Sequence, residues 1–291
     1  MSIAPVDHRK KRMLIQKVDE LPALPVTLME IIRVAGDPDA TANDLAQVIS
    51  KDQSISSMLL RLVNSAFYGH FRSISSISRA IVILGFQTVK SLALGASIFH
   101  SSRESRGNAL DWDKFWVHSL AVAAFSKKLS SKVDVMGDID SETVFVSGLL
   151  HDVGKVVFNN YFSEEYKEVT TTARKDKQWI RTVEEDLMGI DHCEAGQYLA
   201  SKWHFPPPVI EAVAFHHDPG KPENKSGTMA ALTHVADFSC NQIGIGASGN
   251  EKDPELDEVA INILGLGDGK LADVTTEIEN EREAIESFGI E

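Results

Sequence analysis

The stretch GLLHDVGKVVF, residues 148–158, places a histidine and an aspartate side by side within an apolar run. An unpaired ionised group in an apolar interior is strongly unfavourable, so His151 and Asp152 need a charged partner or a metal ion. If the stretch is one helix, Lys155 lies close to both, and Gly148 leaves room beside Asp152. Adjacent helical side chains point about 100° apart, so the pair could bind one ion from two sides. Lys155 could neutralise a carboxylate or hold a phosphate oxygen.

Two ligands hold a hydrolytic metal ion poorly, so further nitrogen and oxygen donors are expected on segments that pack against this one. Such donors are His118 in DKFWVHSLAVAAF, His192 in HCEAGQYLASKW, His216 and His217 at the end of PPPVIEAVAFHH, and Asp237 in ALTHVADFS. Imidazole and carboxylate donors without thiolates favour iron, manganese, zinc or nickel, whereas magnesium prefers more oxygen. We therefore expect one or two divalent transition-metal ions.

Each of these histidines also has a structural interpretation. His118 shares an apolar stripe with Phe115, which is typical of a hydrogen-bonded core histidine. His192 could stand at a helix start, and one of His216 and His217 could face solvent or support a ligand from behind. The remaining histidines are interpreted as structural or surface residues: His8, His70, His100, His204 and His234.

The composition is that of a globular chain. Its 291 residues are 43% hydrophobic, enough for a sizeable core in one large domain or two packed lobes. The two cysteines, Cys193 and Cys240, form no CxxC motif, which argues against a disulfide framework or a thiolate zinc knuckle. No signal-peptide pattern and no uncharged run long enough to span a membrane occurs. We expect a soluble cytoplasmic protein without membrane partners.

The formal net charge of -13 is unevenly distributed. Residues 1–110 carry 13 Lys and Arg against 9 Asp and Glu, whereas the remaining residues carry 16 against 33. The acidic second half argues against wrapping nucleic acid. The only dense basic run is HRKKR at 8–12, which we interpret as a solvated helix start, with nucleic-acid or partner binding as alternatives.

The first half of the chain shows apolar residues at helical spacing. Thr41 and Asp44 resemble a capping pair, and Gly69 ends the pattern that follows them. Amphipathic segments at 77–84 and 89–99 come next, joined by the turn LGF. The stripes of the first two helices consist of Leu45, Val48, Ile49, Ile55, Met58, Leu59, Leu62 and Val63. Nothing here alternates with period two for long enough to predict a strand.

These two helices, joined by ISKDQS, have the outline of a helix-turn-helix DNA reader. The second, however, offers mostly Leu, Val, Met and Ser, with Arg61 as its only basic residue. That composition favours a core over contact with phosphates. We expect no DNA partner.

Several motifs in order, LPALPVTLMEIIRVAGDPDATANDLAQVISKDQSISSMLLRLVNSAFYG, ISSISRAIVILGFQTVKSLAL, FWVHSLAVA and SGLLHDVGKVVF, resemble the HDOD family, the HD-related output domain of bacterial signalling proteins. The resemblance runs from about Leu21 to Pro219. It implies an all-α fold in which an N-terminal helical lobe packs on a lobe similar to HD phosphohydrolases. The expected divisions are an N-terminal helix at 1–20, the first lobe at 21–110, the HD-like lobe at 111–245 and an acidic helical extension at 246–291.

The resemblance also implies roles for the candidate residues. His118, the pair His151 and Asp152, and Asp237 match the H...HD...D signature of the HD superfamily. His192, His216 and His217 are similar to the extra histidines with which HD-GYP cyclic di-GMP phosphodiesterases bind a second metal. The Gly-Tyr-Pro element of those enzymes is absent, because the chain continues as HHDPGKPENKSGT.

Two functions follow from this resemblance. The first is signal transduction, through binding of a protein partner or a nucleotide. The alternative is a metal-dependent phosphohydrolase, with Asp152 and Lys155 as catalytic residues: the metal would lower the pKa of a bound water, and Lys155 would offset developing charge. The thin apolar stripe of the acidic C-terminal segment, Val274, Ile278 and Ile285, predicts a helix that lies over the body or mediates a homodimer.

Overall fold

The computed structural model describes residues 26–64, 73–103, 109–134, 137, 140–222, 227–250 and 255–286. All regular elements in these ranges are helices, and none is a strand, which confirms the predicted all-α class. The predicted helix at 1–20, the basic run at 8–12, Gly69 and His70 lie outside the described residues. Within the described ranges, no helix is both long and apolar enough to cross a membrane.

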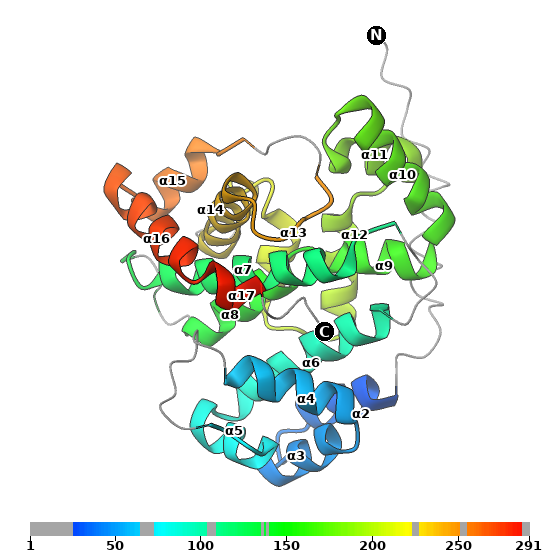
Figure 1. Ribbon diagram of the computed structural model, residues 1–291, viewed down its shortest axis with the longest axis vertical. Coiled ribbons are helices and arrows are strands. Elements are labelled where there is room, and N and C mark those ends of the chain that lie inside the picture. Colours follow the sequence, from blue (N-terminus) through cyan, green and yellow to red (C-terminus); the bar gives the residue numbers. More distant parts are fainter. Residues whose placement is uncertain are drawn as a thin grey trace.

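The N-terminal helices gather at one end of the molecule, at the bottom of Figure 1. The last of them, α6, also contacts the larger group of helices through α8 and α9. They are α2 (Val26–Gly36), α3 (Ala42–Ser50), α4 (Gln53–Val63), α5 (Ile77–Leu84) and α6 (Phe86–Arg103). The predicted capping pair is present, since Thr41 accepts the N–H of Asp44 and the Asp44 carboxylate accepts that of Thr41. Gly85, with φ of 87°, provides the predicted turn between α5 and α6.

The larger group of helices is built around α7, whose middle is buried on all sides. Its members are α7 (Trp112–Ser130), α8 (Ser141–Leu150), α9 (Val153–Tyr161), α10 (Ser163–Asp176), α11 (Ile180–Met188), α12 (His192–Lys202), α13 (Pro207–Phe215) and α14 (Thr228–Ile243). Helices α8 and α14 both pack on α7, and α12 contacts α9 and α13. The segments that carry the candidate metal ligands are therefore neighbours in space (Figure 1).

Two glycines allow helix backbones to approach closely at this point. A Cβ on Gly148 would lie 2.7 Å from Ala123 Cα, so this glycine lets α8 approach α7. That it also leaves room beside Asp152 stays a prediction. A Cβ on Gly154 would lie 1.9 Å from the carbonyl oxygen of His192. The start of α12 therefore rests directly on α9, which carries His192 towards the dyad.

The acidic C-terminal segment lies over the body of the protein. It forms α15 (Glu258–Leu264), α16 (Asp268–Asn280) and α17 (Arg282–Glu286), with a break at Glu281 where one helix was predicted. The predicted stripe of Val274, Ile278 and Ile285 is buried, and α16 and α17 both contact α7. Lys128 on α7 forms ion pairs with Glu277 and Glu281. Homodimer formation stays a prediction.

Replacing Gly154 by alanine should destabilise the protein by about 1–3 kcal/mol, because the new methyl group must displace the backbone of α12. The higher helix propensity of alanine offsets up to about 1 kcal/mol of this. Gly269→Ala is the matched control, since Gly269 is exposed on α16 and a Cβ added there would have no neighbour within 4 Å. Denaturant unfolding measures both; equal midpoints for Gly154→Ala and the unmodified chain would contradict the close approach.

Candidate metal centre

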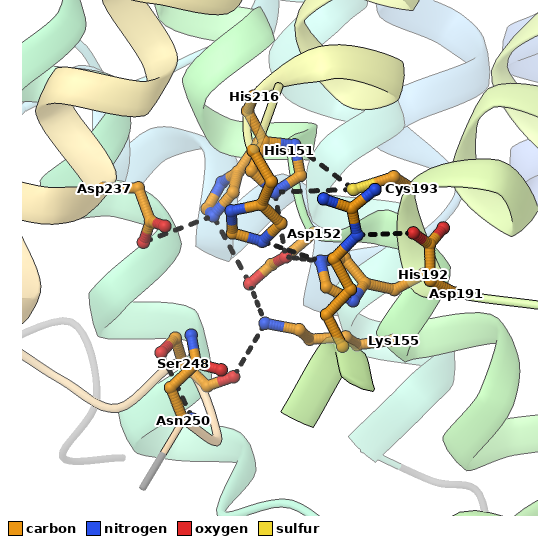
Figure 2. Close-up of polar contacts among 12 residues, drawn as sticks. His151, Asp152, Lys155, Asp191, His192, Cys193, His216, Asp237, Ser248 and Asn250 are labelled. Atoms are coloured by element: carbon orange, nitrogen blue, oxygen red, sulfur yellow. Dashed lines mark hydrogen bonds and ion pairs between the residues drawn. The ribbon is translucent and has the colours of Figure 1, made fainter. Parts of the chain in front are cut away.

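The His151–Asp152 pair lies in a break between two helices. Helix α8 ends at Leu150, and Asp152 (φ -98°, ψ 17°) precedes the first residue of α9. The prediction of one continuous helix through residues 148–158 is therefore wrong. The chain bends here because α8 packs against α7, whereas α9 packs against α12. The bend leaves both side chains pointing into the interior, where they are at most 2% exposed (Figure 2).

A first group of donors surrounds one side of the pair. His118 Nε2 lies 3.0 Å from Asp237 Oδ1, His151 Nε2 lies 3.8 Å from the same oxygen, and His151 Nε2 lies 3.3 Å from Asp152 Oδ2. Metal–ligand bonds of about 2.1 Å place neighbouring ligands about 3–3.5 Å apart at tetrahedral or octahedral angles. The spacing of these four side chains therefore suits a single ion.

A second group lies on the other side of Asp152. Its Oδ1 is 3.3 Å from His192 Nε2 and 3.6 Å from His216 Nε2, and His192 Nε2 is 3.1 Å from His217 Nε2. Figure 2 shows Asp152 between Asp237 on one side and His192 on the other. The structure thus brings all seven predicted ligands together, and the two oxygens of Asp152 face different groups. A carboxylate in this position can bridge two ions.

Hydrogen bonds from behind set the orientation of three imidazoles. His151 Nδ1 donates to the Gly148 carbonyl at 2.7 Å, and His216 Nδ1 donates to that of Ala212 at 3.1 Å. His192 Nδ1 lies 2.5 Å from Glu184 Oε2. In the neutral form of each ring, the proton at Nδ1 leaves the lone pair of Nε2 facing the Asp152 carboxylate. This is the arrangement by which proteins present histidine to a metal.

Several buried atoms in the centre have no hydrogen-bond partner. They are His118 Nδ1, His151 Nε2 and Asp152 Oδ1. A buried polar atom without a partner is unfavourable by about 1–3 kcal/mol, and lone pairs that face one another repel. A cation between the groups would satisfy the last two of these atoms. The residues present therefore fit the predicted metal, with imidazole and carboxylate donors suited to a divalent transition ion.

Lys155 is also fully buried. Its Nζ donates to Asp152 Oδ2 at 2.6 Å and to the Ser248 carbonyl at 3.0 Å. Burial favours the neutral amine, but the Asp152 carboxylate outweighs it and raises the pKa of Lys155. Burial likewise opposes ionisation of Asp152, yet the charge of Lys155 holds its pKa well below the ordinary value. Both groups are charged, and Lys155 neutralises a carboxylate as predicted.

Glu184 was not predicted from the sequence. It is fully buried and accepts the backbone N–H of His192 at 2.9 Å and the hydroxyl of Tyr166 at 3.0 Å, besides facing the ring of His192. Burial raises its pKa to about 8, although Lys155 opposes this. In the sequence it sits among other acidic residues of an amphipathic helix, so only its burial distinguishes it.

Cys193 is a second residue that was missed. Its Sγ lies 3.9 Å from both ring nitrogens of His216, and it belongs to the group of potential ligand atoms formed with His192, His216 and His217. Burial raises the pKa of the Cys193 thiol well above its ordinary value. A neutral thiol packs against the imidazoles, and its position next to His192 in the sequence was the available signal.

An arginine fixes the second group from outside. Arg181 Nε lies 2.6 Å from Asp191 Oδ2, and its Nη2 lies 2.7 Å from Asp218 Oδ2. These two aspartates directly precede His192 and follow His217 in the chain. Asp191 also accepts the N–H of Glu194 and so caps α12. One guanidinium therefore ties together the backbone on both sides of the second donor group.

Replacing Glu184 by glutamine should weaken binding of Zn²⁺ or Mn²⁺ about 10–100-fold, because an amide replaces the carboxyl group that orients His192. Glu211→Gln is the matched control: Glu211 is a buried glutamate whose carboxyl group accepts the N–H of Met229 and not a proton from an imidazole. Titration against a chromophoric chelator measures both affinities. Equal affinities of the two variants would contradict the supporting role of Glu184.

The comparisons with known proteins agree with this architecture. A protein of Treponema pallidum without an assigned function is 29% identical over 211 residues, covering 71% of this chain and 40% of its own. Ribonuclease Y of Mycoplasmoides gallisepticum is 26% identical over 187 residues, covering 61% of this chain and 28% of its own. The chain thus spans less than half the length of either relative.

A solved structure and a family model cover more of the chain. An HDOD domain protein of unknown function from Geobacter sulfurreducens superposes with a TM-score of 0.75 at 27% identity, and 97% of each chain is covered. The model of the HDOD domain matches residues 21–219, which is the extent predicted from the motifs. With its helical fold and its motifs in order, this chain belongs to the HDOD domain family.

Proposed function

We propose that this HDOD protein hydrolyses phosphoesters at a centre of one or two divalent transition-metal ions. The observation that carries the proposal is the set of Nε2 lone pairs, each fixed by a hydrogen bond at Nδ1, that converge on the two oxygens of Asp152. A core that used these histidines only for packing would not need their second nitrogens aimed at one buried carboxylate. The relative named ribonuclease Y supports phosphodiesters as a substrate class.

The ions, when bound, would polarise a phosphoryl oxygen and lower the pKa of an attacking water. The protein keeps its carboxylate donors ionised for this purpose. Burial opposes the ionisation of Asp237, but the hydrogen bond from His118 lowers its pKa to about 2. Asn241 Nδ2 also donates to Asp237 Oδ1 at 2.7 Å, which fixes the carboxylate in place.

The imidazoles of the second group are kept neutral, which is the form that binds a metal. Burial lowers the pKa of His192 and His217 well below the ordinary value, and the nearby charge of Lys155 adds to this effect. Lys155 holds the Asp152 carboxylate and would add a positive charge near a phosphoryl group bound at the ions. Its expected role in turnover is electrostatic stabilisation of the transition state.

Asp152→Asn should abolish binding of Mn²⁺ or Zn²⁺ and reduce hydrolysis of bis(4-nitrophenyl) phosphate to the uncatalysed rate, because both donor groups lose their shared carboxylate.

His192→Gln removes a ligand of the second group alone, and it should retain about one ion per chain. Lys155→Met should retain the ions and lose about 100-fold or more in kcat. Metal analysis and initial rates test these three variants.

Thermal unfolding of each variant separates loss of function from loss of fold, and Glu164→Gln, an exposed charge on α10, serves as the control. Ion-loaded wild-type protein that cleaves neither this diester nor 4-nitrophenyl phosphate nor ribonucleotide diesters would overturn the hydrolase proposal. The proposal that the protein binds metal ions would then be judged only by the metal content of the wild-type protein and the Asp152→Asn variant.

We also propose the regulatory function that the family association implies, with the N-terminal helices as its docking surface. The observation that favours it is a pair of exposed apolar side chains that are adjacent on α5: Val82 is 83% exposed and Ile83 42%. Large apolar side chains that remain this exposed are typical of protein contacts when they cluster.

A photo-crosslinking residue at position 82 should capture a specific protein in cells, whereas one at Glu164 should not. The second position is also exposed but lies on an acidic helix away from α5. Identical captured material from both positions would argue against a docking surface on α5.

A further inference from the structure

The second donor group is built from two pairs of adjacent residues. His192 and Cys193 begin α12, whereas His216 and His217 follow the end of α13, which packs against α12. One nitrogen or sulfur atom of each residue lies within 4.8 Å of the corresponding atoms of the other three. The group therefore contains a sulfur donor, whereas only imidazoles and carboxylates were predicted from the sequence.

The spacing around Cys193 suits coordination of one ion. Its Sγ lies 3.9 Å from His216 Nε2, and His192 Nε2 lies 3.1 Å from His217 Nε2 (Figure 2 shows the sulfur beside the His216 ring). A metal–sulfur bond of about 2.3 Å and a metal–nitrogen bond of about 2.1 Å separate the two ligand atoms by about 3.6 Å at the tetrahedral angle. The sulfur is therefore placed to share an ion with the imidazoles.

Asp152 independently indicates a cation at this position. Its Oδ1 is buried without a hydrogen-bond partner and lies 3.3 Å from His192 Nε2 and 3.6 Å from His216 Nε2. The whole residue is only 2% exposed. A cation held by the second group would satisfy this oxygen, whereas a thiol that only packs against the imidazoles would not.

The two donor groups differ in negative charge. The first contains the Asp237 carboxylate, whereas the second, within the described part of the chain, has no carboxylate of its own. It shares Asp152, whose charge is already paired with Lys155. A divalent ion among neutral imidazoles in a buried site would keep much of its charge uncompensated. The thiolate of Cys193 would compensate it: as the metal–sulfur bond forms, the S–H bond breaks and the proton is released to solvent.

The second group is also held in place and accessible. His234 is buried, with Nδ1 donating to the His216 carbonyl at 2.8 Å and Nε2 accepting the N–H of Asp257 at 2.9 Å. These bonds fix the backbone that carries the second pair of residues. A cavity of about 570 Å³ is lined by His217 and Asp237, one from each donor group, and gives an ion a path to both.

We propose that Cys193 is a thiolate ligand of the ion in the second group, which favours a thiophilic ion such as Zn²⁺ there. The first group has imidazole and carboxylate donors only and accepts a broader range of divalent ions. This inference rests on the metal centre of the proposed function and names the residue that sets the identity of one ion. The two ions of the centre would then differ in kind.

Cobalt provides the readout, because thiolate ligation gives Co²⁺ an intense near-ultraviolet charge-transfer band that imidazole and carboxylate ligands do not give. Titration of the metal-free protein with Co²⁺ should produce this band. X-ray absorption by the Zn²⁺-loaded protein should show a sulfur shell at about 2.3 Å besides nitrogen and oxygen at about 2.0–2.2 Å. Both measurements use the unmodified chain and require no turnover.

Substitutions assign the sulfur signal to one residue. Cys193→Ser should remove the charge-transfer band and the sulfur shell. Cys240→Ser is the matched control and should leave both unchanged, because Cys240 is the other cysteine of the chain, is also buried and belongs to neither set of potential ligand atoms. His192→Gln, in the second group, should remove the band, whereas Asp237→Asn, in the first group, should retain it. Thermal unfolding checks that each variant is folded.

Co²⁺ or Zn²⁺ bound to the unmodified protein without a sulfur signal would overturn the inference, and so would a band that persists in Cys193→Ser or in His192→Gln. Loss of the band in folded Cys240→Ser would overturn it as well. The hydrolase proposal fails separately: a sulfur signal without hydrolysis of any phosphoester contradicts only the hydrolase, and hydrolysis by Co²⁺-loaded protein without a sulfur signal contradicts only the thiolate ligand.

Discussion

The Asp152 carboxylate is the interaction on which the rest of the structure depends. It is buried, faces imidazoles on two sides and accepts a hydrogen bond from a buried lysine. A charge in such a place is tolerable only if every partner is present, because loss of one leaves the others unbalanced. Helices from distant parts of the chain must therefore meet at this point. Close packing through Gly148 and Gly154 is what allows their backbones to come near enough.

Features that depend on local sequence could be predicted. The capping pair at Thr41 and the glycine turn at Gly85 are decided by neighbouring residues, and both are present. The order of the family motifs added the approximate extent of the domain. The convergence of His118 and Asp237, separated by more than a hundred residues, followed only from the resemblance, since no local rule places two helices side by side.

Other features could not be predicted, and the reason is packing. The helix break at Asp152 arises because α8 and α9 rest on different partners, while the sequence there is compatible with a continuous helix. Glu184 looks like its acidic neighbours until α10 and α12 cover it. His234 resembles any core histidine, and only the folded chain shows that it connects the His216 carbonyl, 18 residues earlier, to the N–H of Asp257, 23 residues later.

The family match ends at residue 219, yet α14 and the segment before α15 lie beyond it. Asp237 and the hydrogen bond between His234 and Asp257 both belong to that later portion. Two homologues can therefore share the whole matched region and still differ in whether their centre is complete. A change downstream of the shared boundary can therefore remove a donor while the scaffold that holds the other donors stays the same.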